Sequence, residues 1–102
     1  YNTSSDRRLK SNIQDAASVS TKIDAIQVRQ FDWNVDGSHQ DYGLIAQELE
    51  PIAPIAICRG DDDDEMMSVD YSKLVPMLIK AVQELKTELD AAKTRIATLE
   101  AK

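Results

Sequence analysis

The stretch TSSDRRLKSN, residues 3–12, contains the residue types that nucleophilic catalysis needs. A serine hydroxyl attacks when a neighbouring base takes its proton, and a lysine is such a base only when neutral. Ser5 and Lys10 are therefore a candidate nucleophile and base. The alternative is a solvated loop or helix start, because the stretch has a single Leu and no apolar face.

The spacing of this pair sets two requirements for catalysis. Five extended residues span roughly 17 Å, so a turn or a neighbouring chain must bring Lys10 to Ser5. Desolvation or nearby cations must also lower the pKa of a lysine from its ordinary value of about 10.4. Arg7 and Arg8 are close enough in sequence to contribute. The rest of the fold must meet these requirements.

The composition fits one small domain and excludes several classes of function. The chain has 102 residues, of which 42% are hydrophobic and only 5% aromatic, so association is expected to supplement a small core. A net charge of −6 argues against nucleic-acid binding. No apolar run approaches the roughly 20 residues of a transmembrane helix, so no membrane partner is expected. Because the chain opens without Met, we expect it to be part of a longer protein.

A heptad repeat occupies the C-terminal third of the chain. Apolar residues recur at alternating steps of four and three, which predicts a helix over 72–102, about 45 Å long. Asp70 or Ser72 is expected to cap it, with Pro76 in its first turn. The a positions are Val75, Val82, Leu89 and Ile96, and the d positions are Tyr71, Leu78, Leu85, Ala92 and Leu99. A small domain cannot bury so long a stripe, so we expect it to meet other chains rather than dock on its own domain.

The charges beside the stripe favour a parallel, in-register coiled coil. In that arrangement each g residue faces the e residue five places on in its neighbour. Glu88 would face Lys93 and Arg95 would face Glu100, both pairs of opposite sign. The mixture of β-branched and Leu residues leaves the number of strands open.

The middle of the chain predicts a mixed α+β unit. Hydroxyl caps and helical spacing indicate a short helix over 18–26, and alternation indicates a strand over 27–35. DGSHQ, residues 36–40, predicts a turn, and 42–54 returns to helical spacing. Two further strands, PIAIC and EMMSVDY, are expected on either side of RGDDDDE.

Other features of this unit favour structural roles, and no metal or cofactor is expected. The acidic run 61–65 lacks the spaced ligands of a calcium loop and fits a solvated hairpin tip. The Arg-Gly-Asp triplet at 59–61 is of a kind that arises often by chance. His39 has no second metal ligand in view, and Cys58 is expected to be a small buried hydrophobe.

Four motifs in order resemble those of a known family. SSDRRLKSNI, FDW, YGLIAQELE and VDYSKLVPMLIKAVQEL are similar to the C-terminal intramolecular chaperone domain of bacteriophage tail spikes, tail fibres and endosialidases. A related domain occurs in the membrane-anchored myelin regulatory factor. The resemblance runs from Ser5 to about Leu85, followed by the coiled coil that the family leads one to expect.

The resemblance implies a trimeric folding clamp that releases itself. It implies a homotrimer that aligns the upstream shaft of the same chain and then cuts the bond between Ser4 and Ser5. Ser5 would be the nucleophile and Lys10 the base; Ser4 is a competing nucleophile, but the order Asp-x-Arg-Leu-Lys favours Ser5. The expected division is 1–4 as the end of the fibre, 5–70 as the chaperone unit and 71–102 as the coiled-coil helix.

Because the chain retains residues before Ser5, an uncut precursor, a trapped state and a non-cleaving member all remain open. The rival functions are a permanent receptor-binding or trimerising tip and a coiled-coil adaptor without protease activity. For the chaperone, we expect action in the host cytoplasm during phage assembly and absence from the mature tail after cleavage.

Overall fold

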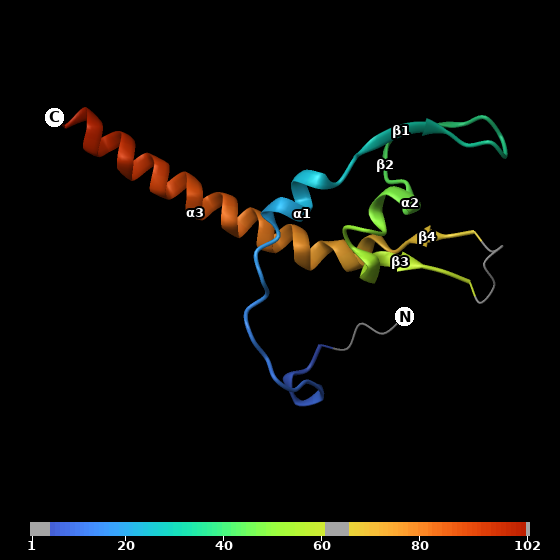
Figure 1. Cartoon of the computed structure of the whole chain (residues 1–102), viewed down its shortest axis with the longest axis horizontal. Coiled ribbons are helices and arrows are strands. Elements are labelled where there is room, and N and C mark those ends of the chain that lie inside the picture. Colours follow the sequence, from blue (N-terminus) through green and yellow to red (C-terminus); the bar gives the residue numbers. More distant parts are fainter. Residues whose placement is uncertain (1–4, 61–65, 102) are drawn as a thin grey trace.

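The computed structural model describes residues 5–60 and 66–101 and shows a small helix–strand unit from which one long helix extends (Figure 1). The long helix, α3 (Val75–Glu100), follows a 3-10 turn, η3 (Tyr71–Leu74). Asp70 caps η3, because its carboxylate accepts a hydrogen bond of 3.1 Å from the Ser72 amide. Pro76 lies in the first turn of α3, where its missing N–H is tolerated. The predicted helix and the place of its proline are confirmed, but the α-helix begins at Val75 rather than at residue 72, and the Asp70 cap belongs to η3.

The first half of the unit is a short helix and a hairpin. Helix α1 (Ser20–Ala25) confirms the predicted helix, and β1 (Arg29–Asp32) confirms the strand. The predicted turn is confirmed for residues 36–38, which lie in the connection between the two strands, but β2 (His39–Gly43) forms a strand where the end of the turn and helical spacing were expected. A lone strand leaves its backbone groups unpaired, and antiparallel pairing of β1 with β2 satisfies them. Only α2 (Ala46–Leu49) remains of the expected helical segment.

The second half contains the other predicted hairpin. Strand β3 (Ile57–Cys58) follows the 3-10 turn η2 (Pro54–Ala56) and pairs antiparallel with β4 (Ser68–Val69). The prediction that Cys58 is buried was wrong, because its side chain is exposed. Successive strand residues point to opposite faces, and Ile57 already faces the core. The acidic run 61–65 lies outside the described residues.

The core that joins these elements is small. Leu49, Ala53, Ala56 and Leu74 form it, and Leu49 is the one large side chain among the described residues that is fully buried. The Cα radius of gyration is 18.9 Å, against about 13 Å for a compact domain of this length. The accessible surface is 8758 Å², whereas a compact monomer of this mass exposes about 5,800 Å². The α+β class is confirmed, and this single chain leaves an unusually large surface to be covered.

The described helices can be compared with the length and hydropathy that a membrane-spanning helix requires. None of them is both long enough and apolar enough to cross a membrane.

Candidate functional site

A tight turn brings the two candidate catalytic residues together. The 3-10 turn η1 (Arg7–Leu9) begins at Asp6, whose carboxylate accepts a hydrogen bond of 2.8 Å from the Arg8 amide. The Lys10 amide closes the turn on the Arg7 carbonyl at 3.1 Å. The Lys10 Nζ therefore lies 2.8 Å from the Ser5 Oγ, which is within hydrogen-bond reach of a nucleophile and its base. Ser4 lies outside the described residues.

Arg8, one of the two cations next to this pair in the sequence, forms an ion pair with Asp6. Arg8 donates from Nε and Nη2 to the Asp6 carboxylate, at 3.1 and 2.8 Å. The hydrogen bonds from Arg8 lower the pKa of Asp6, and the carboxylate in turn raises the pKa of Arg8. The positive charge of Arg8 is thus compensated by the Asp6 carboxylate and contributes little to lowering the pKa of a nearby lysine. This arrangement mainly holds the turn in shape.

Ser5 and Lys10 are both exposed in the single chain. A lysine serves as a general base when burial or cations disfavour its protonated form, so this surface needs a cover to become reactive. The chain from residue 11 to residue 17 is exposed and forms no helix or strand. Within it Asn12 has φ 53°, a conformation that Asn tolerates and that turns the chain. The turn that holds Ser5 and Lys10 is therefore carried on an extended arm, visible below the helix in Figure 1.

Glu84 of α3 fixes the base of this arm. Its carboxylate accepts hydrogen bonds from the Ser18 hydroxyl at 2.6 Å, the Val19 amide at 2.8 Å and the Ser20 hydroxyl at 3.3 Å. These bonds, chiefly the one from Ser18, lower the pKa of Glu84. The predicted hydroxyl cap of α1 is replaced by this carboxylate, since Val19 at the cap position makes no side-chain cap. No local pattern reveals the contact, because the partners lie 64 to 66 residues apart.

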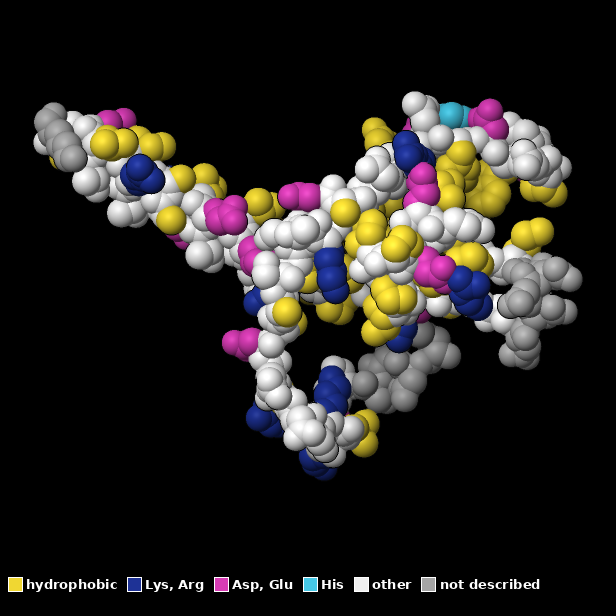
Figure 2. All heavy atoms as spheres, in the orientation of Figure 1, with side chains coloured by type: hydrophobic (Ala, Val, Ile, Leu, Met, Phe, Trp, Pro, Cys, Tyr) yellow, Lys and Arg dark blue, Asp and Glu magenta, His cyan; other side chains and the backbone are white. Residues whose placement is uncertain are grey.

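The apolar stripe along α3 is open to solvent. Its residues other than Ala92 are between 51% and 64% exposed, and Ala92 is also exposed. Figure 2 shows hydrophobic side chains along the visible side of the helix and at its junction with the hairpins. Isolated surface apolar residues are ordinary, but a continuous stripe of this length marks an interaction surface. The stripe consists of Tyr71, Val75, Leu78, Val82, Leu85, Leu89, Ala92, Ile96 and Leu99.

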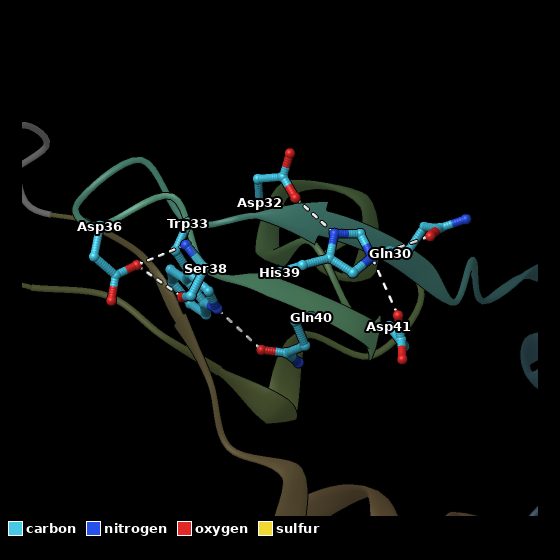
Figure 3. A network of polar contacts seen from close by, with 8 residues as sticks. All are labelled: Gln30, Asp32, Trp33, Asp36, Ser38, His39, Gln40 and Asp41. Carbon is cyan, nitrogen blue, oxygen red and sulfur yellow. Dashed lines mark hydrogen bonds and ion pairs between the residues drawn. The ribbon is translucent and has the colours of Figure 1, made fainter.

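His39 lies in a polar network on the β1–β2 hairpin (Figure 3). Its Nδ1 is 2.6 Å from the Asp32 carboxylate, and its Nε2 is 3.1 Å from Asp41 and 3.2 Å from the Gln30 side-chain oxygen. Sequence reasoning placed His39 in a turn and missed these partners: pairing with β1 brings Asp32 and Gln30 to His39, whereas Asp41 lies two residues on in β2 itself. Among the residues the structure describes, no group of three or more His, Cys, Asp or Glu could hold a metal ion. The network stiffens the hairpin.

Comparison with known protein families shows which family the chain belongs to. The family model described as the chaperone of endosialidase matches residues 5–57, more than half of the chain. The chain belongs to this family. The match begins at Ser5, so it includes the turn that holds Ser5 and Lys10, α1 and the first hairpin. The resemblance drawn from the sequence motifs is confirmed.

A curated relative extends this result. The chain is 33% identical over 60 residues to the long tail fiber protein Gp37 of Enterobacteria phage M1, and the match covers 58% of the chain. The same match spans 24% of the relative, so the chain corresponds to about a quarter of that protein's length.

Proposed function

We propose that this domain is the C-terminal intramolecular chaperone of a phage tail fibre or tail spike. It assembles as a parallel homotrimer, holds the upstream shaft of the same chain in register and then releases itself by cutting between Ser4 and Ser5. One observation carries this proposal: the chaperone family match begins at Ser5, whose hydroxyl lies 2.8 Å from the Lys10 amine. The work is done in the host cytoplasm during phage assembly, and the cut domain is absent from the mature tail.

The chemistry of release follows from these two side chains. Neutral Lys10 takes the proton of the Ser5 hydroxyl, whose oxygen attacks the carbonyl carbon of residue 4. The peptide C–N bond breaks, the Ser5 nitrogen gains a proton, and an ester joins the two segments through the Ser5 oxygen. Water then hydrolyses the ester, leaving a carboxylate on the fibre and a free amine on Ser5. The step needs no cofactor.

Assembly is proposed to switch this chemistry on. Ser5 and Lys10 are exposed in the single chain, and neighbouring copies packed around α3 would supply the cover that a neutral lysine requires. Cleavage would then follow trimer formation and would not release unassembled shafts.

The folding role rests on entropy. Three fibre chains must meet in register before long-range strand pairing stabilises them, and the loss of chain and association entropy opposes that step. A trimeric clamp raises the local concentration of the shafts to roughly the millimolar range. Once the shaft is interlocked, its unfolding barrier holds it and the clamp is dispensable.

Three substitutions test the proposed chemistry. Ser5→Ala and Lys10→Ala are expected to abolish release without preventing assembly, because the apolar stripe and the helix–strand unit remain. Lys10→Arg is expected to fail as well, since a guanidinium stays protonated and cannot accept a proton. Gel analysis of the cut and size-exclusion chromatography with light scattering measure the two properties separately. Cleavage at an undiminished rate in Lys10→Ala would contradict the assignment.

A permanent, non-cleaving trimeric tip is the second candidate. The exposure of Ser5 and Lys10 in the single chain favours it if neighbouring copies leave both residues open. In that case the wild-type chain would stay joined to its shaft at every pH, and Ser5→Ala would change nothing.

A further inference from the structure

An apolar groove lies where the start of α3 meets the β1–β2 hairpin. Its volume is about 400 Å³. Val28 and Tyr42 on its rim are 63% and 80% exposed, a large fraction for a valine and a tyrosine beside a core. The main side chains of its wall are Ile26, Val28, Tyr42, Leu74, Val75 and Leu78.

The groove is continuous with the apolar stripe. Val75 and Leu78 line it, and they are also the a and d residues of the first heptad. Any chain that packs on the stripe at this level must therefore lie against the groove. The heptad register of the stripe therefore determines which residue of a second chain lies against the groove.

The register identifies the residue that reaches the groove. With Val75 at a, Leu74 is at g and Ile79 is at e. In a parallel, in-register assembly Leu74 of one chain faces Ile79 of the next, by the same rule that pairs Glu88 with Lys93. Ile79 is 53% exposed in the single chain, and Leu74 is buried in the wall of the groove. Leu74 is the last residue of η3, directly before α3, and its pair with Ile79 is apolar, whereas Glu88–Lys93 is charged.

We propose that Ile79 of a second copy of this chain docks into the groove. This inference rests on the proposed parallel assembly and adds to it the contact between the helix of one copy and the hairpin of the next. The groove has room for Ile79 and for the flank of the helix turn that carries it. Docking covers Val28 and Tyr42, so the hairpin of each copy is held by its neighbour's helix.

Cysteine cross-linking in the full chain tests the contact. In a Cys58→Ser background, which removes the exposed native thiol, the pair Tyr42→Cys with Ile79→Cys is treated with a short bismaleimide. This reagent can join two thiols that lie too far apart, or in the wrong orientation, to form a disulfide. The expected result is that covalent dimers and trimers replace most of the monomer on a denaturing gel. Tyr42→Cys with Thr87→Cys, at the outward f position, is the matched control and is expected to stay monomeric.

A second pair separates failure of this inference from failure of the proposed assembly. Glu88→Cys with Lys93→Cys reports the parallel helices alone and is expected to cross-link. If it does so while the Tyr42–Ile79 pair does not, the groove contact is wrong and the parallel assembly stands. If neither pair cross-links, both are wrong. Equal cross-linking of the Thr87 control would also overturn the groove contact.

Discussion

Replacing Leu89 by Ala tests whether the stripe along α3 is an interface. Leu89 is 54% exposed in the single chain. Full burial of a leucine is worth about 1.5–3 kcal/mol, so association gains roughly half of that, about 0.8–1.6 kcal/mol per chain. Alanine removes most of this gain, and over three chains the loss is about 2–4 kcal/mol per trimer. The trimer dissociation constant should then rise about 30- to 700-fold.

Sedimentation equilibrium over a dilution series measures this effect. The midpoint concentration of a trimer varies as the square root of its overall dissociation constant, so it should rise about 5- to 25-fold. Thr94→Ala is the control, because Thr94 is exposed at an outward position and its hydroxyl bonds to the Asp90 carbonyl of its own helix. An unchanged midpoint for Leu89→Ala, or equal shifts for the two variants, would refute an interface along the stripe.

Three further substitutions probe two contacts seen in the structure and one contact predicted from the heptad register. Glu84→Ala should expose the Val19 amide to hydrogen exchange and slow cleavage. In the wild type the pKa of Glu84 is lowered, so protection of the Val19 amide from exchange is complete above the ordinary glutamate pKa. This protection is lost as pH falls through the lowered pKa of Glu84. Arg29→Ala should loosen the first hairpin, seen as faster exchange in β1, because Arg29 donates two hydrogen bonds to Glu48 of α2 at 3.0 and 2.9 Å. Glu88→Lys should weaken assembly slightly in light scattering, because each exposed pair is worth about 0.2–1 kcal/mol, and a compensating Lys93→Glu should restore it.

Each of these substitutions has an outcome that counts against its reasoning. Unchanged hydrogen exchange in β1 of Arg29→Ala would show that the contact with Glu48 does not hold the hairpin. Asp90→Ala is the control for Glu84→Ala, because Asp90 pairs with Lys86 of its own helix and should leave the arm unchanged. Equal exchange at the arm in the two variants would show that Glu84 does not anchor it. A Glu88→Lys chain that assembles as well as the wild type at low salt would argue against parallel register.

The sequence predicted those parts of the fold whose signal is local. The a and d positions of α3 repeat over four heptads, so the helix could be predicted directly, as could the capping role of Asp70, which the structure places on the preceding turn η3. Strand β2 could not, because HQDYG has little apolar alternation and is held as a strand by pairing with β1. Exposure of Cys58 depends in the same way on which face of a two-residue strand meets the core.

The candidate site also contains one contact that is local in sequence and one that is not. Ser5 and Lys10 lie within one motif, and the turn between them closes through their immediate neighbours. Glu84 could not be predicted, because it contacts Ser18 across the fold and its sequence neighbours give no sign of this. The sequence motif therefore pointed to the contact between Ser5 and Lys10, whose catalytic role stays a prediction, whereas the anchor of the arm required the three-dimensional structure.

The mass of the product released from a longer chain tests the central claim most directly. A chain that carries its natural shaft before this domain is expressed as wild type and as Ser5→Ala, and both are measured by intact-mass spectrometry. The account predicts that the wild type yields a small fragment whose first residue is Ser5, and that Ser5→Ala remains a single uncut chain. A fragment that begins at another residue, or a cut that persists in Ser5→Ala, would contradict self-release by this serine.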